Sequence, residues 1–294
     1  MSTAASAPPV ARSTDVGTAA QLACLLEVTA PKPGNVTPAA AFHDTSYVDF
    51  LASAVAIGPA ITSAGNEPLG VTIRAAITAT RRWTTTNTNL GIVLLLAPLA
   101  RAALTIPDRP LRDAVRAVLA GTTVADARGV YAAIRLAAPA GLGTVAEQDL
   151  SLPPSVSLTD AMALAQEHDA IAREYATGFA TTFDVGAPAL RRARGEGLSW
   201  NDAIVETYLT LLAAQPDTHI ARKLGLGVAR EVQERGRAAL AAGGVRRAAG
   251  RDAIRTLDHA LRDAANRRNP GATADLTTAA IFVTLLNDGS DGRA

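Results

Sequence analysis

Apolar side chains recur at intervals of three and four residues along nearly the whole chain, and this spacing restricts the fold more than any other feature. In residues 46–57, for example, Tyr47, Phe50, Leu51 and Val55 fall on one face of a helix. No stretch shows the sustained alternation of apolar and polar residues that marks a half-buried strand. The pattern therefore predicts an all-α protein of about ten helices.

The predicted helices follow one another without a charged or proline-rich linker, which favours a single globular domain. Residues 90–103 are apolar on every side, as is typical of a central buried helix. Further helices are predicted at residues 158–181, 200–214, 217–241, 246–265 and 272–286. We expect a disordered tail at residues 1–13, the helical domain at 14–287 and a flexible C-terminus at 288–294.

Charge and composition exclude several classes of protein. The chain has a net charge of +1 and only 4% aromatic residues, so it lacks the basic surface and the stacking platforms of a nucleic-acid binder. The longest apolar run, residues 90–100, is well short of the roughly 20 residues that a membrane-spanning helix needs. A single cysteine, Cys24, excludes an intramolecular disulfide. We expect a cytoplasmic protein without nucleic-acid or membrane partners, and the sequence leaves the oligomeric state open, a homodimer included.

Lysine is rare in this chain. Of the 28 cationic side chains only Lys32 and Lys223 are lysines, and the rest are arginines. A lysine is a compact point charge that does not duplicate the planar fork of arginine, so its retention indicates a specific role. The role is clearest for Lys32, which lies in a polar loop, whereas Lys223 also fits an ordinary helix surface.

Three polar segments place Asn or a cation beside Gly at the start of an apolar helix. They are PKPGNV at residues 31–36, NTNLG at 87–91 and NPGATADL at 269–276. Free backbone N–H groups at a helix N-terminus bind phosphate, and Gly allows the ligand to approach the backbone closely. Ordinary helix capping by Asn, with Pro in the first turn, explains the second and third segments equally well, and both interpretations stay open.

Carboxylates occur beside these segments. Glu27 lies near the end of an otherwise apolar helix, Asp44 and Asp49 flank the start of the next, and Asp275 follows the last Asn-Pro-Gly turn. Carboxylate oxygens suit Mg²⁺, which proteins usually hold through one or two carboxylates and the phosphates of the substrate. The alternative for Asp44 and Asp275 is placement in a first helical turn, which the helix dipole favours.

Taken together and in order, these segments resemble the triphosphoribosyl-dephospho-CoA synthase family, which prepares the prosthetic group of citrate lyase and malonate decarboxylase. The resemblance rests on Glu27 with PKPGNV at residues 31–36, on FHD at 42–44 leading to DF at 49–50, and on NTN-x-G at 87–91, DT-x-IAR at 217–222 and NPGATADL at 269–276. These stretches cover the chain from about residue 20 to 286. The family is all-α, as the periodicity also predicts.

The resemblance implies a transferase that moves a triphosphoribosyl group from ATP to 3′-dephospho-CoA and releases adenine. ATP is then a substrate, Mg²⁺ the cofactor, and residues 14–287 the catalytic domain. Such chemistry needs a base for the attacking hydroxyl and cations for the phosphates. The expected catalytic residues are Glu27, Asp44 and Asp49; the expected phosphate- or substrate-binding residues are Lys32, Gly34, Asn35, Asn87, Thr88, Asn89, Arg222, Asn269 and Gly271; the expected metal ligands are Asp44, Asp49 and Asp275.

One segment departs from the citrate-lyase branch of the family. That branch reads Asn-Thr-His-Lys-Gly where this chain has Asn89 and Leu90 in place of the His and Lys, as in the archaeal and methylotroph branch. A second hypothesis is therefore the same architecture with another phosphoribosyl or pyrophosphate-activated donor and acceptor, in the biosynthesis of a pterin or furan one-carbon coenzyme. A third is a helical protein that binds a nucleotide without catalysis.

Overall fold

All regular secondary structure in the described part of the chain, residues 13–138 and 148–290 of the computed structural model, is helical. Within these residues the only β-type pairing is an isolated bridge between Thr37 and Ala40. The predicted all-α class is therefore confirmed.

The first half of the chain forms seven helices, namely α1 (Ser13–Thr29), α2 (Tyr47–Ala56), α3 (Gly58–Thr62), α4 (Leu69–Thr80), α5 (Leu90–Thr105), α6 (Leu111–Ala120) and α7 (Val124–Ala137). The second half forms α8 (Leu158–Ala165), α9 (Ala170–Thr177), α10 (Ala187–Gly195), α11 (Trp200–Ala214), α12 (Thr218–Leu224), α13 (Leu226–Ala241), α14 (Ala248–Leu261) and α15 (Gly271–Ser290). A π-helical turn, η1 (Thr182–Gly186), precedes α10, and a 3₁₀ turn, η2 (Gly244–Arg246), precedes α14.

The predicted count of about ten helices is wrong, because short breaks divide segments that are helical in period throughout. The predicted helix at 158–181 is interrupted before α9, where the Asp169 carboxylate accepts hydrogen bonds from the backbone N–H groups of Ile171 and Ala172. The predicted helix at 217–241 is interrupted at Gly225, whose φ of +88° lies outside the helical region. The cap begins a new helix at α9 and the positive φ ends α12, at positions where the apolar pattern alone predicts a continuous helix.

The structure describes only part of the two chain ends that the sequence predicts to be non-helical. Most of the predicted tail, residues 1–12, lies outside the described residues, as do residues 291–294. The last helix, predicted for 272–286, is longer than expected, because α15 continues to Ser290.

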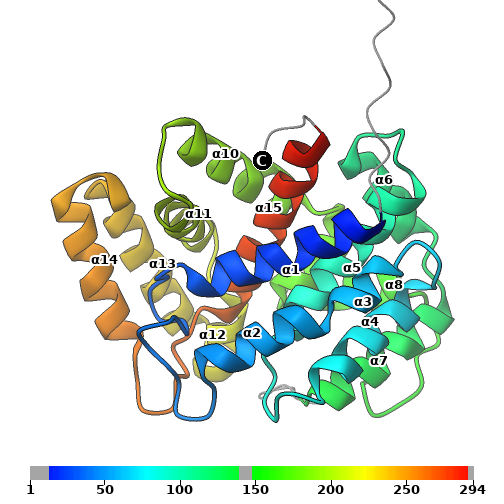
Figure 1. Ribbon diagram of the computed structural model, residues 1–294. Coiled ribbons are helices and arrows are strands. Elements are labelled where there is room, and N and C mark those ends of the chain that lie inside the picture. Colours follow the sequence, from blue (N-terminus) through cyan, green and yellow to red (C-terminus); the bar gives the residue numbers. More distant parts are fainter. Residues whose placement is uncertain (1–12, 139–147, 291–294) are drawn as a thin grey trace, which may run out of the picture.

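Three helices form the centre of the molecule. Eleven residues of α5 are buried, which confirms the predicted central helix. Helix α15 packs against α5 and α1 and also against α10 and α11, so the two halves of the chain share one continuous core (Figure 1). The shared core supports the prediction of one domain.

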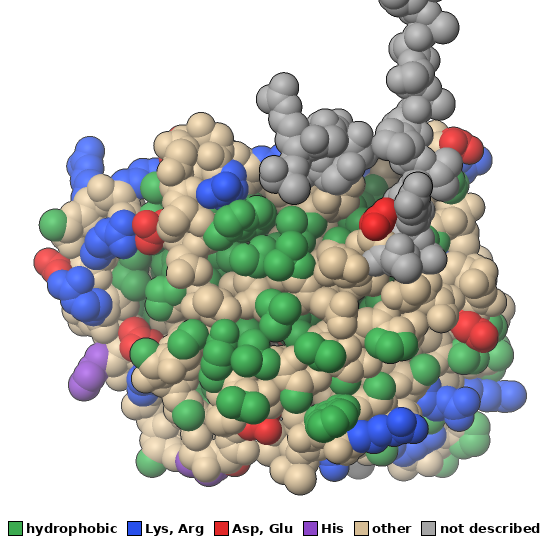
Figure 2. Space-filling model, viewed as in Figure 1, with side chains coloured by type: hydrophobic (Ala, Val, Ile, Leu, Met, Phe, Trp, Pro, Cys, Tyr) green, Lys and Arg blue, Asp and Glu red, His purple; other side chains and the backbone are tan. Residues whose placement is uncertain are grey.

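The face that carries α1 and α2 has an uncharged middle. Figure 2 shows hydrophobic side chains over this region and Lys and Arg side chains toward the edges. Leu22, Val48 and Val55 are the large apolar side chains exposed on these two helices. None of the helices in the described residues is long and apolar enough to cross a membrane.

Helices α4 and α7 cross with their backbones in contact. A Cβ added to Gly129 would lie 2.5 Å from the carbonyl oxygen of Gly70, and a Cβ added to Gly70 would lie 2.5 Å from the carbonyl oxygen of Asp126. The Asp126 carboxylate also accepts a hydrogen bond of 2.9 Å from the backbone N–H of Gly70. Two glycines therefore allow this crossing, and backbone atoms cannot yield to a methyl group as a flexible side chain can.

We expect Gly129→Ala to lower the free energy of unfolding by roughly 1–3 kcal/mol, the usual effect of overpacking. Gly227→Ala is the matched control, because Gly227 lies in α13 with no atom within 4 Å of an added Cβ; it should be neutral or stabilise by up to about 1 kcal/mol. Urea denaturation of the two variants measures the difference. Equal stabilities would contradict the contact between α4 and α7.

Candidate active site

A cleft of about 1070 Å³ opens where the N-terminal ends of α5, α9 and α15 meet. Leu90 and Gly91 of α5, Ile171 of α9, and Gly271 and Ala272 of α15 line it. The helix dipole gives the N-termini of α5 and α15 a partial positive charge that favours anions in the cleft. The N–H groups that begin α9 are already bonded to the Thr218 hydroxyl and the Asp169 carboxylate.

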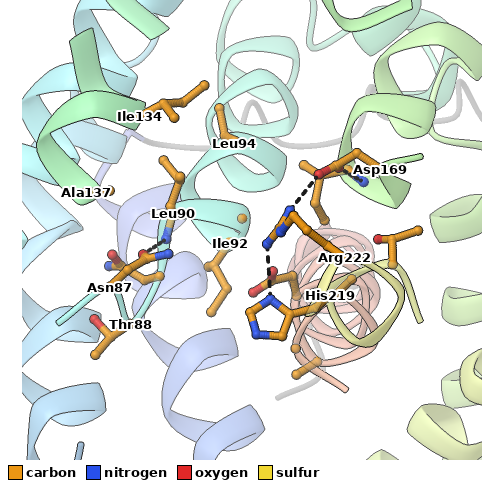
Figure 3. A pocket seen from close by; sticks show the side chains of 18 of the residues that line it. Asn87, Thr88, Leu90, Ile92, Leu94, Ile134, Ala137, Asp169, His219 and Arg222 are labelled. Carbon is orange, nitrogen blue, oxygen red and sulfur yellow. Dashed lines mark hydrogen bonds and ion pairs between the residues drawn. The ribbon is translucent and has the colours of Figure 1, made fainter. Parts of the chain in front are cut away.

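The two sides of the cleft differ in character. Figure 3 shows the apolar side chains of Leu94, Ile134 and Ala137 gathered at one end, and Arg222 and His219 across the cavity from Asn87, Thr88 and Leu90. An apolar end suits a flat base or an alkyl chain, and a polar side suits phosphates and sugar hydroxyls.

Cationic side chains from separate elements also line the cleft. Arg81 follows α4, Arg173 belongs to α9, and Arg222 and Lys223 belong to α12. Burial, with the neighbouring charge of Arg222, lowers the pKa of Lys223. Of the two lysines, Lys223 is thus the one that reaches the cleft, although the polar loop around Lys32 makes Lys32 the stronger candidate in the sequence.

Glu27 and Lys32 form a buried ion pair beside the cleft. The Lys32 Nζ lies 3.0 Å from Glu27 Oε1, and the two side chains are 0% and 5% exposed. Lys32 also donates to the backbone carbonyl of Glu27 and, at 3.1 Å, to that of Ala30. Burial raises the pKa of Glu27 and the charge of Lys32 opposes the rise; burial lowers the pKa of Lys32, and Glu27 opposes that.

This pairing changes the interpretation of Lys32. Its three donors all have protein partners, and Lys32 is absent from the residues that line the cleft, whereas Glu27 is among them. The structure therefore places Lys32 behind Glu27, where it holds the carboxylate, and not in contact with a ligand as expected from the sequence. Glu27 lies where the sequence placed it, in the cleft.

In the rest of the PKPGNV loop, Gly34 contacts another helix and Asn35 lines the cleft. Gly34 has a φ of +75°, and its N–H donates to Asp258 at 2.8 Å, away from the cleft. Asn35 lines the cleft, and its amide donates to the Tyr208 hydroxyl at 2.9 Å. Of the two expected binding residues, only Asn35 is thus available to a ligand.

Asp44 and Asp49, expected to act together, lie in different settings. Asp44 lines the cleft with half of its side chain exposed. Asp49 accepts 2.7 Å hydrogen bonds from both the N–H and the hydroxyl of Ser46, as the third residue of a capping box at the start of α2. Because Asp49 stabilises this helix end and lies outside the cleft lining, we do not retain it as a catalytic or metal-binding candidate.

The NTNLG segment lines the cleft with side chains that also support the backbone. Asn87 Oδ1 accepts the N–H of Leu90 at 3.1 Å, the Thr88 hydroxyl lies 2.6 Å from that of Ser53, and Asn89 donates to Thr80 at 3.0 Å. Asn87 thus caps the start of α5, as the capping interpretation predicts. All three residues also line the cleft, where a ligand can reach them.

Asp275 lies against the start of α5. A Cβ added to Gly91 would be 2.1 Å from Asp275 Oδ2, so any other residue here would displace the carboxylate from its present position. Asp275 lines the cleft, and its carboxylate has neither a hydrogen bond nor an ion pair with any residue that the structure describes. Burial, followed by the negative charge of Glu27, raises its pKa well above the usual range.

The NPG turn brings the start of α15 to the cleft. Asn269 and Gly271 both line it, and the buried Asn269 Oδ1 has no hydrogen-bond partner within residues 13–138 and 148–290. The turn is held by Asp217, whose carboxylate caps α12 through the N–H of Ile220 and also accepts the N–H and hydroxyl of Thr273.

Sequence reasoning missed two residues of this region. Arg222 was expected in the site, but its neighbours Asp169 and His219 were not. Arg222 Nη1 lies 3.4 Å from Asp169 Oδ2, and Arg222 Nη2 lies 3.2 Å from His219 Nδ1 (Figure 3). Asp169 lies 53 residues before Arg222, and its one sequence signal, an Asp before a helix, predicts only a cap.

No three His, Cys, Asp or Glu side chains within residues 13–138 and 148–290 are grouped as a metal site would require. The expected ligand set of Asp44, Asp49 and Asp275 is therefore not assembled as a preformed site. Asp275, half-buried in the cleft, has the donor chemistry for a metal that is also held by substrate phosphates.

Comparison with known proteins gives consistent results. The family model described as ATP:dephospho-CoA triphosphoribosyl transferase matches residues 13–293. A Lactiplantibacillus plantarum protein named for 2-(5″-triphosphoribosyl)-3′-dephosphocoenzyme-A synthase activity is 28% identical over 290 residues, which cover 90% of this chain and 95% of that protein. An Azotobacter vinelandii protein of the same name is 36% identical over 116 residues, so that alignment spans 39% of either protein.

A solved structure is also similar. The chain shares 28% identity and a TM-score of 0.62 with an Archaeoglobus fulgidus protein described as a triphosphoribosyl-dephospho-CoA synthase. The match covers 80% of this chain and 97% of that one, so nearly all of the Archaeoglobus fold has a counterpart here.

We expect Lys32→Met to lower the free energy of unfolding by about 3–5 kcal/mol, because it leaves a buried Glu27 without its counter-charge. The double variant Lys32→Met, Glu27→Gln should recover part of this loss. Arg255→Met, which removes an exposed pair with Asp252, is the control and should change stability by no more than about 1 kcal/mol. Chemical denaturation at pH 7 provides the values, and a Lys32→Met variant as stable as the control would rule out the buried pair.

The stability of the protein should also depend on His219 in acid. Burial, followed by the charges of Lys223 and Arg222, lowers the pKa of His219 from 6.5 to about 3. Between these two values the unfolded chain binds the proton and the folded chain does not, so stability falls as the pH drops from about 6.5 towards 3. Thermal melts of wild type and His219→Gln across this range isolate the effect: the gap between the curves should change with pH, and a constant gap would contradict the shift.

Proposed function

Because the chain belongs to the ATP:dephospho-CoA triphosphoribosyl transferase family, we propose that it transfers the triphosphoribosyl group of ATP to 3′-dephospho-CoA and releases adenine. The cleft formed where the N-termini of α5, α9 and α15 meet is the observation that carries the proposal. Its volume of about 1070 Å³ lies at the upper end of the usual range for ligand sites, as two nucleotide-sized substrates require.

The contrast between the two sides of the cleft supports the placement of the substrates. The apolar end, with Leu94, Ile134 and Ala137, suits adenine, which must leave as a neutral base. The helix N-termini and the side chains of Arg222 and Lys223 suit the triphosphate. This arrangement leaves the ribose between the two, beside the carboxylates.

In the proposed reaction, a ribose hydroxyl oxygen of the acceptor forms a bond to C1′ of the ATP ribose while the bond from C1′ to the adenine nitrogen breaks. The hydroxyl proton passes to Glu27, the departing adenine takes up a proton from solvent, and Glu27 then releases its proton to solvent, so that charge and atoms balance. Glu27 is suited to act as the base because Lys32 holds its carboxylate 3.0 Å away in one orientation. Positive charge that develops at C1′ is stabilised by the carboxylates of the cleft.

Mg²⁺ belongs to this proposal as a partner of the phosphates. Asp275 would hold the ion, with the more exposed Asp44 as the other carboxylate that lines the cleft. The ion would neutralise charge on the triphosphate. We also retain the prediction of a cytoplasmic enzyme that acts on small-molecule substrates.

The proposal predicts adenine release and a coenzyme product whose mass exceeds that of dephospho-CoA by one triphosphoribosyl unit, when the protein is incubated with ATP, Mg²⁺ and 3′-dephospho-CoA. Glu27→Gln should lower the rate by about 100-fold or more, the usual contribution of a general base. Asp252→Asn, on the exposed surface of α14, is the control and should match wild type. Mass spectrometry follows both products.

Two results would contradict parts of this assignment. A Glu27→Gln variant with the wild-type rate would remove Glu27 as the base. Bound ATP without any product would reject dephospho-CoA as the acceptor and direct the same assay to precursors of pterin and furan coenzymes.

A further inference from the structure

We infer that His219 binds a phosphate of the nucleotide donor: its neutral ring, oriented by Arg222 and Asp169, donates a hydrogen bond from Nε2 to a phosphate oxygen. The inference rests on the proposed function, since it takes the donor to be a nucleotide triphosphate. His219 is then an additional binding residue of the site, and Arg222 and Asp169 are the residues that position it. The similarity to known proteins assigns no role to His219.

The orientation of the ring follows from the side chains next to it. Arg222 Nη2 lies 3.2 Å from His219 Nδ1, and Arg222 Nη1 lies 3.4 Å from Asp169 Oδ2 (Figure 3). A guanidinium group has only donors, so Nδ1 must accept. Asp169 is itself fixed, because its other oxygen accepts the N–H groups at the start of α9. The three side chains therefore form a chain of contacts that holds the imidazole in one position.

The same contacts determine which ring nitrogen carries the proton. Burial, with the charges of Lys223 and Arg222, lowers the pKa of His219 to about 3, so the ring is neutral near pH 7. A neutral imidazole has one N–H, and because Nδ1 accepts from Arg222, the hydrogen is on Nε2. His219 lines the cleft, and Nε2 has no hydrogen-bond partner among the residues that the structure describes. Figure 3 shows this nitrogen on the side of the ring away from Arg222.

The surroundings of the ring favour an anionic acceptor. Arg222 and Lys223 follow on the same helix, and the start of α15 contacts the ring, since a Cβ added to Gly271 would be 3.3 Å from its Cγ. Two carboxylates of this region are already engaged, Asp169 with Arg222 and Asp217 with the N–H groups of Ile220 and Thr273. A third, Asp275, also lines the cleft, and the charge of Arg222 acts to lower its pKa. A donor amid cations and a helix N-terminus matches a phosphate oxygen better than a neutral carbonyl or ring nitrogen.

Inorganic tripolyphosphate tests this assignment without requiring turnover, so a failure of the proposed transfer reaction would not be confused with a failure of this inference. We expect His219→Phe, which keeps a planar ring and loses the donor, to weaken tripolyphosphate binding by about 10- to 100-fold in calorimetric titrations. His219→Gln, which keeps an N–H donor, should remain within about threefold of wild type. His259→Phe, on the exposed side of α14, is the matched control and should bind as wild type does.

Adenosine is the second probe, because it has the base and sugar but no phosphate. The inference predicts that His219→Phe binds adenosine as tightly as wild type. Loss of adenosine binding with tripolyphosphate binding unchanged would assign His219 to the nucleoside and overturn the inference. Wild-type protein that does not bind tripolyphosphate would overturn it as well.

A measurement on the wild-type protein covers the case in which the His219 variants do not fold. Long-range ¹H–¹⁵N correlation spectra distinguish the two neutral forms of a histidine ring. We expect the hydrogen on Nε2 of His219, and we expect its signal to shift when tripolyphosphate is added. A hydrogen on Nδ1, or an Nε2 signal that tripolyphosphate leaves unchanged, would refute the inference.

Discussion

One buried carboxylate, that of Asp217, joins the starts of two helices, and the geometry of the cleft depends on it. Its Oδ1 accepts the N–H of Ile220 in α12, and its Oδ2 accepts the N–H and the hydroxyl of Thr273 in α15. Burial raises the pKa of Asp217, while these hydrogen bonds act in the opposite direction. Since α12 carries Arg222 and α15 carries Asp275, this single group fixes a cation and a carboxylate of the cleft relative to each other.

The charged groups of the cleft are arranged at different depths. Glu27, paired with Lys32, and Asp275, packed against Gly91, are the carboxylates enclosed between α1, α5 and α15. Arginine and lysine side chains come from α9, α12 and the end of α4, together with helix N-termini that attract anions. A nucleotide donor has phosphates for the cationic side chains, a sugar for the carboxylates and an apolar base for the apolar end. The cleft therefore fits such a donor better than a uniformly charged ligand.

Several residues act on the site without facing it. Lys32 sets the position of Glu27, and Asp169 sets that of Arg222, which in turn orients His219. Gly91 has no side chain, and its contribution is the space that Asp275 occupies. The pairs Asp169–Arg222 and Gly91–Asp275 join distant parts of the chain, and Lys32 reaches Glu27 because its loop turns back on α1. The positions of the charged groups in the cleft therefore depend on how the helices pack.

The helical class, the buried helix at α5 and the polar segments at helix starts can all be predicted from local sequence, because helical period, caps and glycines act within a few residues. The sequence also identified Glu27, Asn35, Asp44, Arg222 and Asp275, all of which line the cleft. The packing of the helices is needed to show that Lys32 faces Glu27 and lies outside the cleft, that Asp49 caps α2, and that Asp169 and His219 join the site. The reason is that a side chain's partner across the fold is set by how the helices pack, which local spacing does not encode.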